Sequence, residues 1–143
     1  MTTLQESIDL NVPAEAVWAQ LHKMDSYPQF IEGVQSVKKR GNDQAAVQIK
    51  ANGHSQKCDT EIVDGRRNEQ MTFKIKSAPH LGGTIELRPM GDRRTTMQVR
   101  LEYDPQELSE TFGLNGSSHN GTVKQTMQQN MAKFKSLVER SHS

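Results

Sequence analysis

Residues 25–30 read Asp-Ser-Tyr-Pro-Gln-Phe, a stretch that is too apolar and too broken to be an ordinary loop. Asp25 or Ser26 can cap a short helix, because both side chains accept hydrogen bonds from free backbone N–H groups. Pro28 would then lie just inside the start of this helix, where a proline loses no hydrogen bond. Gly33 suits the C-terminal end of the same helix. We expect three apolar anchors about one turn apart, namely Tyr27, Phe30 and Ile31.

A strand and a first helix are predicted before this corner. Residues 4–12 alternate between apolar and polar side chains, and a period of two is typical of a half-buried strand. Pro13 ends the strand and suits the first turn of a helix over residues 13–24. One side of that helix is apolar, with Trp18 beside it. The apolar residues are Ala16, Val17, Leu21 and Met24. The two short helices would meet at the corner as a V.

Residues 34–103 alternate almost continuously and predict six antiparallel strands in a meander, with one wet face and one buried face. Turn-forming residues separate the strands, at 41–43, 52–53, 64–65, 79–83 and 91–92. The residues expected to face inward are Ala45, Val47, Ile49, Ala51, Cys58, Thr60, Ile62, Met71, Phe73, Ile75, Gly83, Ile85, Leu87, Met97, Val99, Leu101 and Tyr103.

The longest predicted helix spans residues 122–140. Its apolar residues recur at steps of three and four, and they are Val123, Met127, Met131, Phe134, Leu137 and Val138. One amphipathic helix opposite one concave sheet is an α+β arrangement. We therefore predict a single domain over residues 1–143. In it, a curved seven-stranded antiparallel sheet wraps around the long C-terminal helix, and the two short helices lie between the first and second strands.

The composition permits an incompletely filled interior. Hydrophobic residues make up 33% and aromatic residues 5% of the 143 residues, and both fractions are low for a globular domain. A hydrophilic protein with a filled core would have the same composition. Cys58 is the only cysteine, so no intrachain disulfide forms and a reducing compartment, the cytoplasm, is expected. The N-terminal residues do not read as a signal peptide, and no apolar run is long enough to span a membrane. The net charge of +1 demands neither a nucleic-acid nor a membrane partner.

This order of elements resembles the helix-grip fold of the START-like superfamily, also called SRPBCC, and most closely its polyketide cyclase/dehydrase-like branch. The resemblance is carried by residues 12–21 (VPAEAVWAQL), residues 25–37 (DSYPQFIEGVQSV) and the last helix with Phe134, Leu137 and Val138. Tyr-Pro-x-Phe also looks like the coenzyme Q-binding and ribosome-toxin branch, where Leu-Pro-Trp-Cys usually follows. Residues 31–34 read Ile-Glu-Gly-Val here, which counts against that branch.

The resemblance implies a cavity between the sheet and the long helix, with the Trp and Phe of the two motifs as scaffold. We expect this cavity to bind or transport a hydrophobic or amphipathic small molecule that is lipid-like or polyketide-like, with residues 104–121 gating access. Small inward residues and flexible methionines suit such a wall, although large neighbours could also fill the space. The expected lining is Phe30, Ile49, Ala51, Cys58, Thr60, Met71, Phe73, Ile85, Leu87, Met97, Val99, Tyr103, Met127, Met131 and Phe134.

An enzyme of the polyketide cyclase or dehydratase type is the alternative, with Tyr103 and Thr60 acting on the ligand. The aromatase/cyclases that this branch contains use an inward arginine, whereas Arg88 and Arg100 here have outward parity. No phosphate-binding loop, nucleophile elbow or carboxylate pair is evident, and no catalytic residue is assigned. Cys58 is interpreted as a small buried apolar residue.

No cofactor or metal is expected. His54, His80 and His119 would lie at one end of the sheet, where a metal site is conceivable, but solvated loop histidines are the simpler interpretation.

The first, third and fifth turns of a meander share the other end of the sheet. They carry Lys38, Lys39, Arg40, Arg66, Arg67, Arg93 and Arg94, offset by Asp43, Asp64, Glu69 and Asp92. Solvated hairpin tips would explain this basic end. A second alternative function is an interaction module that uses it on an anionic headgroup, a membrane surface or RNA, although a nucleic-acid partner and stable membrane anchoring are not expected. The pattern does not indicate an oligomeric state.

Overall fold

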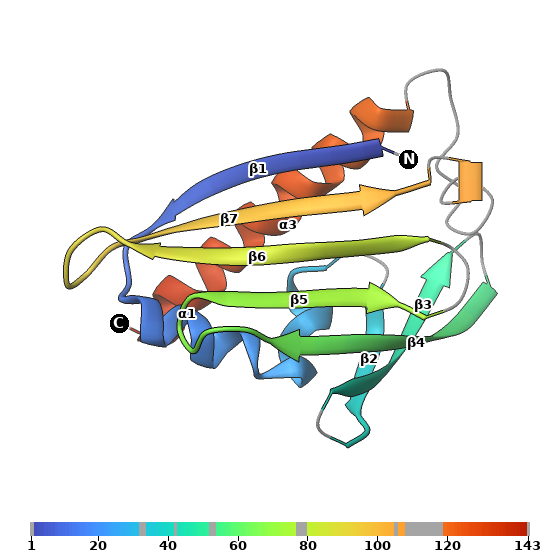
Figure 1. Ribbon diagram of the computed structural model, residues 1–143, viewed down its shortest axis with the longest axis horizontal. Helices are drawn as coiled ribbons and strands as arrows, with labels where there is room; N and C mark the ends of the chain where they lie inside the picture. Colours follow the sequence, from blue (N-terminus) through green and yellow to red (C-terminus); the bar gives the residue numbers. More distant parts are fainter. Residues whose placement is uncertain are drawn as a thin grey trace.

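The computed structural model describes residues 2–31, 34–41, 43–51, 54–76, 80–104, 106–107 and 119–142. Figure 1 shows one curved antiparallel sheet with a long helix behind it. The strands are β1 (Thr2–Leu10), β2 (Val34–Lys39), β3 (Gln44–Ala51), β4 (His54–Asp64), β5 (Gln70–Ile75), β6 (Leu81–Pro89) and β7 (Thr95–Tyr103). The helices are α1 (Ala14–Leu21), the 3₁₀ helix η1 (Met24–Gln29) and α3 (His119–His142). The predicted α+β architecture with seven strands is confirmed.

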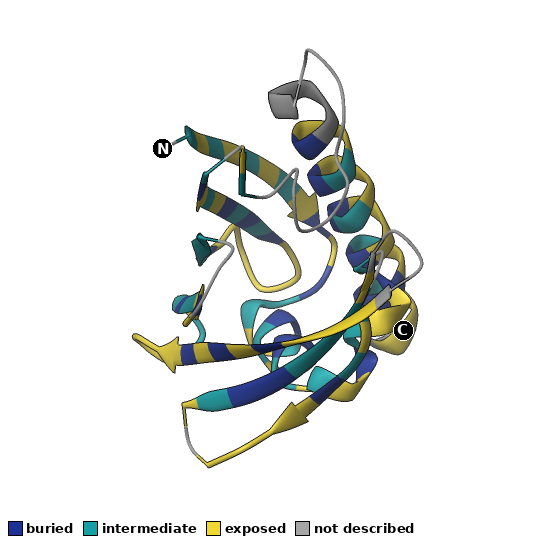
Figure 2. Cartoon of the chain, turned by 90° about the vertical axis from the view of Figure 1, so that its right-hand side faces the viewer, coloured by how far each residue is buried: buried dark blue, intermediate teal, exposed yellow. Residues whose placement is uncertain are grey.

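The strand order in the sheet is β1-β7-β6-β5-β4-β3-β2, so every neighbour along the meander is a neighbour in space and β1 closes onto β7. Figure 2 shows α3 on the concave side of the sheet. Side chains on one parity of β1 are shielded while those on the other parity are exposed, as a half-buried strand requires. The concave face therefore carries the residues that the alternation assigned to the interior.

Several boundaries differ from the predicted ones. β1 covers Thr2–Leu10 rather than residues 4–12, β6 begins at Leu81 inside the predicted turn at 79–83, and α3 begins at His119 rather than at residue 122. Backbone pairing continues beyond the alternating apolar residues, because ladder hydrogen bonds need no apolar side chain.

The corner at residues 24–30 differs from its prediction in its capping. The first helix ends at Leu21, and Pro13 is its N-cap residue rather than part of its first turn. η1 begins after Lys23 with no side-chain cap, and Pro28 lies near its end. The Ser26 hydroxyl is buried and donates to the carbonyl of Lys23 at 2.6 Å, while it accepts from the Gln20 side chain at 3.0 Å. It joins α1 to η1 and so is not available to cap.

The apolar anchors at this corner behave as predicted. Phe30 is only 7% exposed and lies in the central core. Its ring meets that of Phe134 on α3 edge-on, with 5.0 Å between the ring centres, and that of Tyr27 at 5.4 Å. Tyr27 and Ile31 pack against the same core. The corner therefore fixes the position of α3 through one buried aromatic side chain.

His22, the residue after α1, connects this corner to the end of β4. Nδ1 of His22 lies 2.7 Å from the carbonyl of Trp18, and Nε2 lies 2.9 Å from both carboxylate oxygens of Asp64 at the end of β4. The Tyr27 hydroxyl donates to the carbonyl of Leu21 at 2.5 Å. Burial, and then the nearby Asp64 carboxylate, raise the pKa of Tyr27 far above its usual value. These contacts tie α1 and η1 to the sheet.

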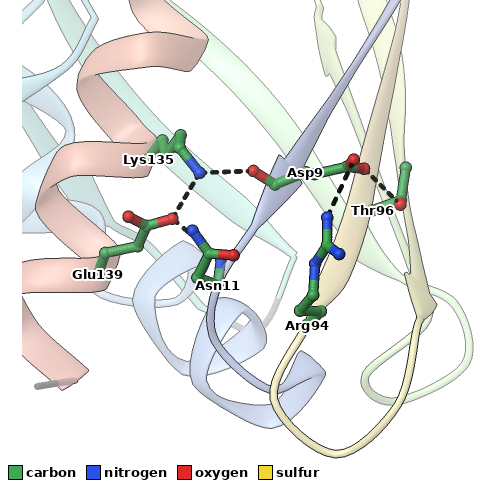
Figure 3. Close-up of polar contacts among 6 residues, drawn as sticks. All are labelled: Asp9, Asn11, Arg94, Thr96, Lys135 and Glu139. Carbon is green, nitrogen blue, oxygen red and sulfur yellow. Dashed lines mark hydrogen bonds and ion pairs between the residues drawn. The ribbon is translucent and has the colours of Figure 1, made fainter.

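A polar cluster fixes the C-terminal half of α3 to the end of β1 (Figure 3). Lys135 Nζ donates to the backbone carbonyl of Asp9 at 2.8 Å and to Glu139 at 2.6 Å. The backbone N–H of Asn11 donates to the same Glu139 oxygen at 2.9 Å. The Asp9 carboxylate in turn accepts from Thr96 at 2.7 Å. The hydrogen bonds from Lys135 and Asn11 hold the pKa of Glu139 below its usual range.

Phe30→Ala is expected to lower the free energy of unfolding by about 3–5 kcal/mol, because it leaves a cavity against Phe134. Urea denaturation gives this value. Val63→Ala, at a side chain that is 37% exposed, is the control and should cost about 0.5 kcal/mol or less. A loss below about 1 kcal/mol for Phe30→Ala would show that this ring does not hold the corner.

Glu139→Gln is expected to lower the free energy of unfolding by about 1–2 kcal/mol at pH 7. A carboxylate whose pKa is lowered by folding stabilises the native state above its unfolded pKa, and this contribution disappears as the pH falls through the folded pKa. The difference between wild type and variant should therefore shrink in acid. Glu61→Gln, at an exposed residue of β4, is the matched control. A difference that stays constant from pH 7 to pH 3 would contradict the assigned role of the carboxylate.

Candidate ligand-binding site

The concave face between the sheet and α3 contains most of the residues predicted to line a cavity. Eight of them belong to one buried cluster: Phe30, Met71, Leu87, Met97, Val99, Met127, Met131 and Phe134. Phe73 and Ile85 are partly buried against that cluster, and Ile49 is half-buried. Cys58 and Thr60 are buried, and Tyr103 lies in a second cluster with Val123. The side chain of Ala51 is outside the described residues.

One row of side chains crosses five strands on this face. Ile62 pairs with Phe73, Phe73 with Gly83, Gly83 with Leu101, and Leu101 with Leu4. All except Ile62 are only partly shielded from solvent. The row is therefore an accessible apolar floor opposite α3, and we call it the floor row.

Gly83 lies at the centre of the floor row and has to be glycine. A Cβ atom there would come within 2.7 Å of the Phe73 ring and of the Arg100 carbonyl. The Phe73 ring occupies the space in front of Gly83 instead. Phe73 is itself only half-buried.

The polar side chains on this face, Thr60, Cys58 and Tyr103, are neutral and are not activated for catalysis. The Thr60 hydroxyl donates to the Cys58 carbonyl over a long 3.5 Å. Burial, and then the neighbouring Asp59 carboxylate, raise the pKa of the Cys58 thiol. Burial also raises the pKa of Tyr103, which is 0% exposed. Both groups therefore stay protonated at neutral pH and can take part in hydrogen bonds, but neither is activated as a nucleophile or acid.

The two strand arginines point away from the concave face, as their parity predicts. Arg88 is exposed, and Arg100 lies 3.7 Å from Glu102 on the convex face. A polar groove of about 340 Å³ surrounds Arg100, and its wall includes Glu61, Lys74 and Thr84. Sequence reasoning missed this groove. Gly82 is the sequence signal from which this groove could have been predicted. It places no side chain between its two neighbours across the sheet, Lys74 and Glu102.

Two other predictions depend on parts of the chain with little description. Of the predicted gate at 104–121, residues 105 and 108–118 lie outside the described residues, so the gate stays a prediction. Asp104 accepts from the backbone N–H groups of Gln106 and Glu107, and Glu107 accepts from that of His80.

His80 is half-buried, and the side chains of His54 and His119 are not described. Within the described ranges, no three His, Cys, Asp or Glu side chains are grouped to hold a metal ion.

Comparison with known proteins identifies the class. The chain belongs to the family described as polyketide cyclase / dehydrase and lipid transport, whose model matches residues 1–139. A 17.2 kDa Streptomyces lincolnensis protein of uncharacterised function, from the melC2-rnhH intergenic region, is 22% identical over 140 residues. That match covers 97% of this chain and 91% of the relative.

Solved structures share the fold. A START superfamily protein from Mycobacterium smegmatis matches with a TM-score of 0.76 and 16% identity, over 96% of this chain and 97% of its own. The Zhui aromatase/cyclase from Streptomyces sp. R1128 matches with a TM-score of 0.74 and 14% identity, over 99% and 96%. These likenesses confirm the predicted helix-grip fold. Among the described helices, none is both long and apolar enough to cross a membrane.

Proposed function

We propose that the protein binds a hydrophobic or amphipathic small molecule, lipid-like or polyketide-like, between the sheet and α3. The observation that carries this proposal is the partly accessible floor row of Phe73, Gly83, Leu101 and Leu4 on the concave face. A filled core would shield these side chains completely, because protein interiors pack densely. An apolar ligand lying on them would gain about 25 cal/mol for each Å² of apolar surface that it removes from water.

The α3 side of the proposed site consists of flexible side chains. Met127 and Met131 are buried on α3, and Met71 on β5 and Met97 on β7 belong to the same buried cluster. Methionine side chains adapt to ligands of different shape, since they are unbranched and polarizable. This lining fits a carrier that accepts a class of molecules. We also propose that residues 1–143 form a single domain and that it works in the cytoplasm, where its one thiol stays reduced.

The first experiment is native mass spectrometry of the freshly purified protein, followed by organic extraction of any bound molecule. We expect a discrete apolar adduct on the wild-type chain. Met127→Trp adds volume to the α3 wall and is expected to abolish the adduct while the fold survives, because overpacking costs about 1–3 kcal/mol. Gln125→Trp, at an exposed position of the same helix, is the matched control and should keep the adduct. An adduct that persists in Met127→Trp would place the site elsewhere.

Catalysis on the bound molecule is the alternative, because the family description covers both cyclase and lipid-transport proteins. Tyr103 is the group to test, since its side chain is fully buried at the end of β7. If the protein is a carrier, the extracted molecule is recovered unchanged after incubation, and Tyr103→Phe alters only affinity. Turnover that Tyr103→Phe removes, with the adduct retained, would overturn the carrier assignment in favour of an enzyme.

A further inference from the structure

The basic side chains of the protein lie outside the proposed ligand site. All 18 Lys and Arg residues fall within the described residues, and 17 of them are exposed. The remaining one, Lys135, is half-buried and donates to the Asp9 carbonyl and to Glu139, at the end of β1 beside α1. On the central strands, Lys74 and Arg100 line the groove on the convex face. The positive charge of the chain is therefore directed to solvent and not to the floor row.

Lys124 reaches the inner face of β1 from α3, but it is already paired. Its Nζ lies 3.6 Å from Glu6 Oε1, and Nε2 of Gln128, one turn further along α3, lies 3.4 Å from the same oxygen. Glu6 has the shielded parity of Leu4 and Ile8, and its side chain is 21% exposed. An anionic ligand would therefore compete with a carboxylate for this ammonium group.

The end of the site opposite α1 is acidic. β7 leads there into Asp104, as Figure 1 shows, and the Asp104 carboxylate accepts from the backbone N–H groups of Gln106 and Glu107. The Glu107 carboxylate accepts from the backbone N–H of His80 at 2.7 Å, and Asp104 and Glu107 are both half-buried. The sequence of residues 104–118 contains three acidic residues and no Lys or Arg. A negatively charged headgroup at this end would be repelled.

The polar groups within the site are neutral. Thr60 is 6% exposed, Cys58 is 1% exposed and Tyr103 is fully buried. Hydroxyl groups such as those of Thr60 and Tyr103 form hydrogen bonds with hydroxyl or carbonyl oxygens. A carboxylate moved from water into such an interior loses its hydration without gaining a cation. This loss is far larger for a carboxylate than for an alcohol, an ester or a ketone.

We propose that the site between the sheet and α3 takes uncharged apolar molecules with hydroxyl, ester or ketone oxygens, and that it excludes carboxylates and phosphate esters. This inference rests on the proposed ligand site and names the chemical class of its ligand. Fatty alcohols, their esters and neutral polyketides fit the site. Free fatty acids and phospholipids do not fit it, because each would bring a negative charge to a site without a free cation.

The test is displacement of the neutral fluorescent probe N-phenyl-1-naphthylamine from the wild-type protein at pH 7. The competitors share one chain length and differ in their head group: decanol, methyl decanoate and sodium decanoate. We expect decanol and methyl decanoate to displace the probe. Decanoate should bind on the order of a hundredfold more weakly than decanol, because its carboxylate finds no cation in the site.

A basic residue placed in the floor row should change this selectivity. Phe73→Lys adds an ammonium group at a half-buried position of the row and is expected to raise the affinity for decanoate, relative to decanol, by about tenfold. Thr72→Lys is the matched control, because it adds the same charge at the preceding residue of β5, which is also half-buried but has the opposite parity. It should leave the ratio of the two affinities unchanged. Thermal unfolding shows whether each variant folds.

Met127→Trp separates the site from the outer surface. It should abolish displacement by decanol, whereas an anion bound at the basic turns would be unaffected. The proposal is overturned if decanoate competes as well as decanol in the wild type and Met127→Trp abolishes both, and the ligand site then still stands. It is also overturned if Thr72→Lys changes the selectivity as much as Phe73→Lys does. If the wild type binds neither the probe nor decanol, the proposed ligand site is itself wrong and this inference fails with it.

Discussion

The edge-to-face contact between Phe30 and Phe134 is the constraint on which the rest of the structure depends. It joins the corner after α1 to the C-terminal half of α3, with 5.0 Å between the ring centres. Lys135 and Glu139 then fix the same half of α3 to the end of β1 through charge-assisted hydrogen bonds. With one end of α3 held in this way, its remaining turns lie opposite the concave face and face the floor row.

The accessibility of that row follows from the way the sheet curves. Antiparallel strands twist, so the strands far from β1 turn away from a straight helix. Fully buried side chains such as Leu10 and Val17 close the part of the interior next to α1, while Phe73 and Leu101 further along stay only partly shielded. The Cys58 thiol and the Tyr103 phenol remain neutral and offer only hydrogen bonds. Affinity at such a site therefore comes mainly from apolar surface that the ligand buries. The convex face and the turns between strands, by contrast, carry charged side chains.

Much of the fold and part of the site could be predicted from the sequence. Alternation fixed which side chains of β3 to β7 face inward and placed Arg88 and Arg100 outside, since a strand has a strict period of two. Capping at Ser26 was wrong, because its hydroxyl serves a contact with Gln20 that depends on how α1 and η1 meet. The contact of Phe73 with Gly83 and the exposure of Met90 depend on sheet register and turn projection. Local patterns do not encode either of these.

Paramagnetic relaxation in methyl NMR spectra tests most directly whether an apolar ligand binds on the floor row between the sheet and α3. A neutral long-chain alcohol carrying a nitroxide label serves as the probe. The account predicts selective broadening of the methyl signals of Leu4 and Leu101 in the floor row and of Ile85 beside it. Signals from Leu10 and Val17 in the closed end of the core should be unaffected. Broadening confined to exposed methyl groups such as that of Met90, with the floor row unchanged, would contradict a ligand site between the sheet and α3.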